Sequence, residues 1–148
     1  MGCVVKCGTK THYLRSKTLN YFKIVIFDAF IHFIKNNISL SSDNIIFYNE
    51  FIHDYNSGIK DINNYYILSQ LYVEFLQIVD CIGLNYLLQS PDNNHIYLFS
   101  KSKEIYNCIH KLENNIDTES QYYDKNNVFF FTNLFEQSFL NKNNIYIY

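Results

Sequence analysis

Residues 5–19 read VKCGTKTHYLRSKTL, and this stretch decides how the chain begins to fold. Two short β-prone runs, at residues 4–7 and 11–14, flank Gly8-Thr9-Lys10. A glycine-bearing turn between two such runs is typical of a β-hairpin. The stretch therefore predicts a hairpin whose second strand leads through Thr18-Leu19 into the next element.

A long apolar segment follows at residues 16–37. Its large side chains recur at steps of three and four residues, as Phe22, Ile26, Phe30 and Phe33 show. This spacing indicates a helix with one buried face. The run at residues 24–27 also fits a buried strand, so the pattern leaves both structures open.

Farther along, helix and strand signals alternate. Asp43 and the serines before it supply N-cap chemistry for a helix that closes near Gly58. Residues 62–82 carry the strongest helical pattern, with one apolar face formed by Ile67, Leu68, Leu71, Phe75, Ile78, Val79 and Ile82. The sequence further predicts an interruption at Gly83, helices at 84–88 and 103–112, and strands at 38–40, 95–99 and 145–148.

The composition is that of a folded domain. The 148 residues are 48% hydrophobic and 18% aromatic, which excludes a disordered chain and suffices for one core. Short strands mixed with helices predict the α/β (α+β) class, with a small sheet covered by helices. Pro91 and the polar residues after it divide the chain into residues 3–90 and a C-terminal α/β extension at 91–148. The asparagine-rich usage is typical of AT-rich genomes, such as those of large DNA viruses.

The charge is unevenly distributed along the chain. The net charge of −2 argues against a general polyanion binder, and we expect no nucleic-acid partner. The first 27 residues contain five basic side chains and no acid, so the rest holds 12 − 5 = 7 basic residues against 14 acids, a balance of −7. A basic end and an acidic body can attract one another between copies of the chain.

The four cysteines, Cys3, Cys7, Cys81 and Cys108, form no C-x-x-C pair, and the sequence shows no secretory or membrane-spanning apolar run. We therefore expect reduced thiols, a cytoplasmic location that includes the cytoplasm of a host cell, and no membrane partner. Cys3, Cys7 and His12 are the best candidate metal ligands, but zinc requires four converging ligands. We expect neither a metal nor a cofactor.

The sequence offers no catalytic constellation. Gly8-Thr9-Lys10-Thr11 lacks the further glycines of a phosphate-binding loop. His53 and Asp54 are adjacent and cannot face each other on a helix, and no Ser/His/Asp order stands out. We expect a protein that is not an enzyme.

Several short sequence motifs, taken in order along the chain, resemble those of one family. Lys6-Cys7-Gly8-Thr9, His12-Tyr13 and Thr18-Leu19 follow one another as in the opening of the BTB/POZ domain of the potassium-channel tetramerisation type. The family's acidic loop, Phe-bearing helix and closing turn have similar counterparts here in Asp43, Phe47 and Tyr55-Asn56-Ser57-Gly58. Its Leu-Gly-Ile motif is resembled by VDCIGLNYLL at residues 79–88. The resemblance covers residues 3–90 and implies a BTB/POZ-like fold.

This resemblance also implies a function. BTB/POZ domains are non-enzymatic interaction modules that self-associate as dimers or head-to-tail rings, and many adapt substrates to cullin ubiquitin ligases. The expected partners are thus a second copy of the chain and a cullin or another host protein, with opposed charges favouring head-to-tail contact. The candidate interface residues are Lys10, His12, Arg15, Lys17, Asp43, Tyr65, Tyr66 and Tyr72.

A second interpretation stays open at this point. Without the first hairpin, the helical runs at 20–36, 43–56 and 62–88 could pack as a bundle. The protein would then be a mainly helical viral or microbial virulence factor that binds a host protein through a hydrophobic groove. A distinct β component separates the two interpretations.

Overall fold

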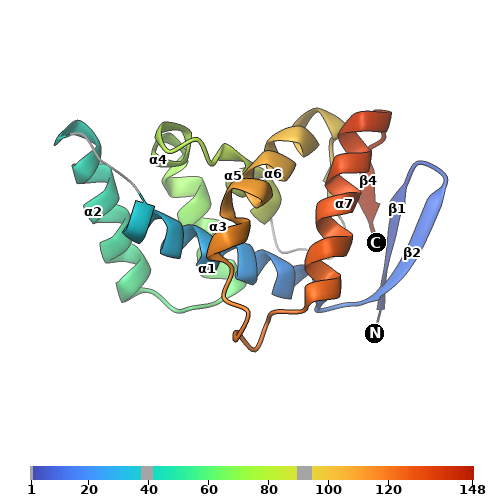
Figure 1. Cartoon of the computed structure of the whole chain (residues 1–148), viewed down its shortest axis with the longest axis horizontal. Helices are drawn as coiled ribbons and strands as arrows, with labels where there is room; N and C mark the ends of the chain where they lie inside the picture. The colour runs from blue at the N-terminus through green and yellow to red at the C-terminus, as the bar shows by residue number, and fades with distance from the viewer. Residues whose placement is uncertain (1, 38–41, 90–94) are drawn as a thin grey trace.

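The computed structural model describes residues 2–37, 42–89 and 95–148. Within these ranges seven α-helices pack beside one small antiparallel sheet, so the predicted α+β class is confirmed (Figure 1). The elements are, in chain order, β1 (Gly2–Cys7), β2 (Lys10–Arg15), α1 (Thr18–Asn37), α2 (Ser42–Ser57), α3 (Ile62–Leu71), α4 (Val73–Ile78), α5 (Ile82–Leu88), β3 (His95–Tyr97), α6 (Phe99–Leu112), the 3₁₀ turn η1 (Glu113–Asn115), α7 (Lys125–Asn141) and β4 (Ile145–Ile147).

The predicted hairpin is present. Strands β1 and β2 pair antiparallel, with Cys7 opposite Lys10 at the turn. Gly8 has a φ of 62°, in the left-handed region that glycine adopts without a steric penalty, which explains why a glycine stands there. The helical-bundle alternative required this hairpin to be absent.

The C-terminal strand completes the sheet within its own chain. The strand order is β2-β1-β4-β3, so β4 lies between β1 and β3 and pairs antiparallel with both. Alternate residues of β1 and β4 are buried, among them Val5, Cys7, Ile145 and Ile147. In Figure 1 the sheet stands at one end of the molecule, with the helices on one side of it. One sheet face therefore joins the core and the other does not.

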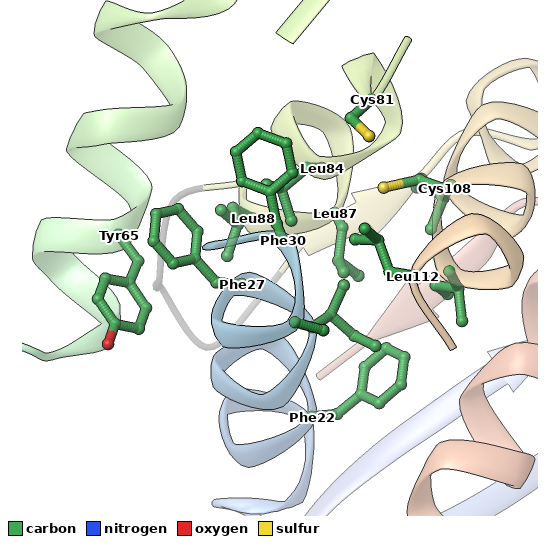
Figure 2. Close-up of a cluster of buried hydrophobic side chains, with 14 of the residues drawn as sticks. Phe22, Phe27, Phe30, Tyr65, Cys81, Leu84, Leu87, Leu88, Cys108 and Leu112 are labelled. Atoms are coloured by element: carbon green, nitrogen blue, oxygen red, sulfur yellow. The ribbon is translucent and has the colours of Figure 1, made fainter. Parts of the chain in front are cut away.

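Helix α1 is the centre of the core, which settles residues 24–27 as helical. Phe27 and Phe30 of α1 are fully buried, and the Phe27 ring stacks on Tyr65 of α3 at 4.1 Å and 11°. Figure 2 shows this cluster continuing through Leu84, Leu87 and Leu88 to Leu112. The core thus contains residues from both sides of residue 90. The division at residues 90–91 and the strand predicted at 38–40 fall outside the described residues.

The predicted apolar face of residues 62–82 is wrong in part. Ile67, Leu71 and Ile78 are exposed by 48%, 70% and 43% respectively. The face that meets the core is formed instead by Tyr65, Leu68, Ser69, Phe75, Leu76 and Val79. These helices carry apolar side chains around more than one face, and periodicity does not say which face is buried.

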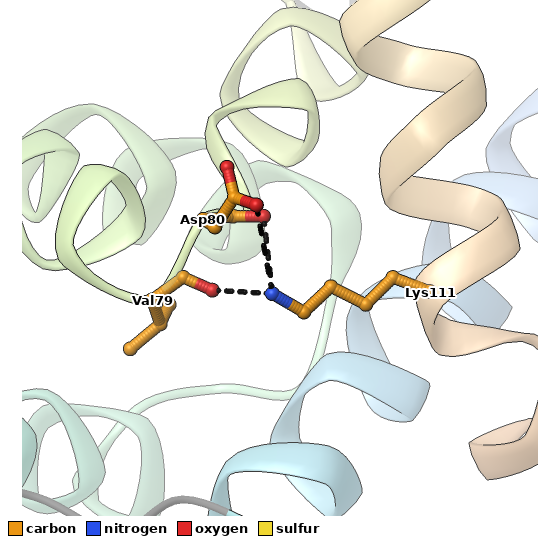
Figure 3. A network of polar contacts seen from close by, with 3 residues as sticks. All are labelled: Val79, Asp80 and Lys111. Atoms are coloured by element: carbon orange, nitrogen blue, oxygen red, sulfur yellow. Dashed lines mark hydrogen bonds and ion pairs between the residues drawn. The ribbon is translucent and has the colours of Figure 1, made fainter.

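The helical path is interrupted before Gly83 and not at it. Asp80 has a φ of 57°, which ends α4, and Gly83 lies inside α5. Lys111 of α6 donates a hydrogen bond of 2.9 Å to the Val79 carbonyl and lies 4.0 Å from the Asp80 carboxylate (Figure 3). A cation from α6 thus satisfies a free carbonyl at the end of α4.

We predict a modest loss of stability when the N-cap of α3 is removed. The Asp61 carboxylate accepts a hydrogen bond of 2.9 Å from the Asn64 backbone N–H, which would otherwise lack a partner. Asp61→Ala should lower the free energy of unfolding by about 1 kcal/mol in chemical denaturation. Asn63→Ala, at an exposed position of the same turn, is the control and should change stability far less. Equal losses in both variants would contradict the cap.

Candidate interaction surfaces

One face of the sheet is open and aromatic. Residues directly opposite each other in an antiparallel pair share a face, and the register sets Val4 opposite Tyr13, and Tyr146 opposite both Lys6 and Ile96. Val4 also exchanges two backbone hydrogen bonds with Tyr148. The outer sheet face, as we name it, consists of Val4, Lys6, Thr11, Tyr13, Arg15, Ile96, Tyr146 and Tyr148.

The outer sheet face is exposed and basic. Tyr13 is 81% exposed, Tyr148 56% and Ile96 48%. The Lys6 ammonium lies 5.7 Å from the centre of the Tyr148 ring. The four strands contain Lys6, Lys10 and Arg15 and no acidic residue. A clustered apolar and aromatic surface of this kind is typical of an interaction site.

A second exposed surface runs along α3 and α4. Hydrogen bonds from Tyr72 N to Leu68 O and from Leu76 N to Tyr72 O carry the helical path across the junction. The exposed side chains therefore follow one another at helical spacing. The helical stripe, as we name it, consists of Ile67, Leu71, Glu74 and Ile78.

The helices around this stripe are acidic. Helices α2, α3 and α4 contain Asp43, Glu50, Asp54 and Glu74 and no lysine or arginine. In Figure 1, α2 lies at the end of the long axis opposite the sheet, and α4 stands next to it. The molecule thus carries an acidic, aliphatic surface and a basic, aromatic surface on elements that are far apart.

The predicted basic interface residues lie where the hairpin meets solvent. Lys10, Arg15 and Lys17 are exposed. His12 differs, because its ring packs edge-on against Phe130 of α7 at 5.0 Å, on the inner face of the sheet. His12 is thus half-buried against its own chain.

The predicted aromatic residues divide between core and surface. Tyr65 is 3% exposed and belongs to the core, which leaves it little surface for a partner. Tyr66 is half-buried, and Tyr72 donates a hydrogen bond to the Asp54 carboxylate. Burial, together with this hydrogen bond, raises the pKa of Tyr72 to about 12. Asp43 lies in the first turn of α2, and its side chain is outside the described part of the chain.

Sequence reasoning missed most of the outer sheet face and the exposure of the helical stripe. Tyr146 and Tyr148 reach that face only because β4 inserts beside β1. The paired residues Lys6 and Tyr146 are 140 residues apart in sequence. Leu71 was expected in the core and is exposed. The one available signal was the excess of apolar residues over what a single helix face can bury.

A polar cleft of about 720 Å³ lies between α1, α2, α3 and the segment after α6. Burial raises the pKa of the Asp28 carboxyl at this site, and the Tyr65 hydroxyl donates a 3.0 Å hydrogen bond to it that opposes the shift. Lys35 and Lys60 both lie over the Tyr55 ring, at 5.8 and 3.7 Å from its centre. Two acids, Asp28 and Asp117, thus balance two lysines in the cleft, which leaves it without a preferred charge of ligand.

The described residues do not assemble a metal site. In residues 2–37, 42–89 and 95–148 no three His, Cys, Asp or Glu side chains group closely enough to hold a metal ion. Cys3 and Cys7 carry raised thiol pKa values through burial. The thiols of Cys81 and Cys108 face each other (Figure 2), and their hydrogen bond lowers the pKa of Cys81 and raises that of Cys108.

Comparisons with protein-family models, curated proteins and solved structures find no significant match to this chain. Among the described helices, none combines the length and the apolar character that crossing a membrane requires.

Proposed function

We propose that the protein is a non-enzymatic protein–protein interaction module that self-associates head to tail. In this contact the helical stripe of one copy docks on the outer sheet face of the next. The observation that supports the proposal is the complementarity of the two surfaces. One offers aliphatic side chains beside acids, and the other offers tyrosines beside cations.

Both components of the contact have a physical reason. Leu71 and Ile78 would be buried against Tyr13 and Tyr148. Burial stabilises the contact by about 25 cal/mol of free energy per Å² of apolar area removed from water. Glu74 would lie against the part of the outer sheet face that carries Lys6. The strands contain no acidic residue that could pair with Lys6 instead. Charge complementarity of this kind orients a contact and speeds its formation.

A head-to-tail contact accounts for the charges better than an isologous dimer. In an isologous dimer the same surface of both copies meets. A dimer through the outer sheet face would therefore place Lys6 and Arg15 of one copy near Lys6 and Arg15 of the other. A stripe-to-stripe contact would place Glu74 beside the other acids of α2 and α4. Repeated head-to-tail contacts close into a ring or continue as a filament, depending on the rotation between neighbours.

The resemblance of residues 3–90 to BTB/POZ domains supports the same function, because those domains are assembly modules. By that resemblance a cullin or another host protein is a further partner of an assembled protein. Binding of a host protein by the helical stripe itself is the second candidate function, since an exposed aliphatic row at helical spacing fits an amphipathic helix of another chain.

We expect the purified protein to form oligomers whose mass rises with protein concentration. Light scattering coupled to size-exclusion chromatography measures this mass, and high salt should reduce it because the contact pairs opposite charges. Leu71→Asp should return the protein to the monomer. Leu140→Asp is the matched control, because Leu140 is also an exposed leucine, at 60%, but lies on α7.

Two outcomes would contradict self-association through these surfaces. A wild-type protein that remains monomeric at all concentrations would remove the proposal outright. An oligomer that Leu140→Asp dissociates as fully as Leu71→Asp would place the contact elsewhere.

A further inference from the structure

A wide cleft lies at the end of the hairpin that is remote from its turn. It has a volume of about 1050 Å³ and is formed by the end of β2, the start of α1 and the segment that precedes α7. The side chains that matter to its chemistry are Arg15, Lys17, Tyr21, Tyr122, Tyr123 and Asp124. The cleft is therefore built by segments about 100 residues apart in sequence.

The cations of this cleft have no anionic partner. Arg15 and Lys17 are exposed, and neither forms an ion pair with a carboxylate in the described part of the chain. The acid among the lining residues, Asp124, is engaged elsewhere: it accepts hydrogen bonds of 2.8 and 3.3 Å from the backbone N–H groups of Asn126 and Asn127, as the N-cap of α7. The cleft thus presents two cations and one capping carboxylate, which leaves a net positive charge for an anion, and its concave shape strengthens this potential.

Aromatic rings form another part of the cleft wall. The rings of Tyr21 and Tyr122 are 5.1 Å apart at an angle of 59°, and both are half-buried, so the wall is held in place. Hydrogen bonds from Tyr122 N to the Ser120 hydroxyl and from Tyr123 N to the Ser120 carbonyl order the segment that carries them. A planar, uncharged ring system is the group that such a wall accepts best, through stacking.

We propose that this cleft binds a nucleoside phosphate. The phosphate lies against Arg15 and Lys17, whose donors match its oxygens, and the base lies against Tyr21 and Tyr122. The volume accommodates one nucleotide. The ligand is either a free mononucleotide or the 5′-phosphorylated end of a nucleic-acid strand, because both present the same chemistry.

Isothermal titration calorimetry of the full chain tests the proposal with AMP, ATP, GTP and UMP as probes. We expect at least one nucleotide to bind with a Kd below about 1 mM, and both adenosine and inorganic phosphate to bind at least about tenfold more weakly. A 5′-phosphorylated tetranucleotide distinguishes the two sources. Tighter binding of the tetranucleotide than of any mononucleotide assigns the cleft to strand ends, and the reverse order assigns it to free nucleotides.

Variants locate the ligand. Arg15→Gln, Lys17→Gln and Tyr122→Leu should each weaken binding by about tenfold or more, whereas Lys103→Gln, an equal charge change at an exposed position of α6, should not. Circular dichroism checks that the variants are folded. The titration repeated on Leu71→Asp separates this site from self-association. Failure of all four nucleotides and of the tetranucleotide to bind, or an equal loss in Lys103→Gln, would overturn the proposal.

Discussion

Replacing Lys23 by methionine is expected to raise the free energy of unfolding by about 3 kcal/mol at pH 7. Lys23 is fully buried in α1, and its Nζ has no hydrogen-bond partner among the described residues. The Lys23 ammonium lies over the Tyr97 ring, whose centre is 5.9 Å away. Burial lowers the pKa of the Lys23 ammonium from 10.5 to about 8, and this shift measures the cost of the buried charge.

The gain from this substitution should disappear as the pH rises. The unfolded lysine keeps its proton to about pH 10.5 and the folded one loses it near pH 8, so the unfolded chain binds more protons between these values. Wild-type stability therefore gains from Lys23 deprotonation across this window, and the difference from Lys23→Met shrinks. All other groups titrate alike in both proteins and cancel.

Urea denaturation of both proteins from about pH 7 to about pH 10 measures this difference. Lys103→Met, at an exposed position of α6, is the control and should show neither the gain nor the pH dependence. A Lys23→Met protein less stable than wild type at pH 7, or a difference that stays constant with pH, would contradict the assignment.

Gly83→Ala is expected to destabilise the fold by about 3 kcal/mol, although alanine is the better helix former. A Cβ at this position would lie 2.1 Å from the Glu104 carbonyl oxygen and 2.8 Å from the Cys108 Cβ. Both obstacles belong to α6, and one is backbone, so the two helices would have to move apart.

Thermal and chemical denaturation measure this loss. Glu104→Ala leaves the Glu104 carbonyl in place and removes only an exposed side chain, so it should leave stability nearly unchanged. Stability of Gly83→Ala equal to that of wild type would show that α5 and α6 are not in contact at this point.

The parts of the fold that follow from local chemistry could be predicted from the sequence. Gly8 supplies the left-handed turn residue, and the runs beside it alternate as strands do, so the hairpin was accessible. The length and period of α1 were accessible in the same way. Each of these features depends on neighbours a few residues away.

The parts that depend on distant contacts could not be predicted. Nothing near Leu71 distinguishes it from Leu68, yet one is 70% exposed and the other 4%, because the choice of face is made by packing on α1 and α5. The outer sheet face exists because β4 inserts between β1 and β3. The role of Gly83 likewise depends on α6, and its local sequence suggested a break.

The central claim, head-to-tail contact between the outer sheet face and the helical stripe, is tested most directly by mixing two variants that each lack one surface. Tyr13→Asp alters the outer sheet face, at a residue that also lines the cleft of about 1050 Å³, and Leu71→Asp alters the stripe. The two positions are 81% and 70% exposed. Each variant alone should be monomeric in sedimentation velocity. Their equimolar mixture should form a heterodimer, because one intact stripe meets one intact sheet face. A mixture that stays monomeric while wild type oligomerises would contradict the account.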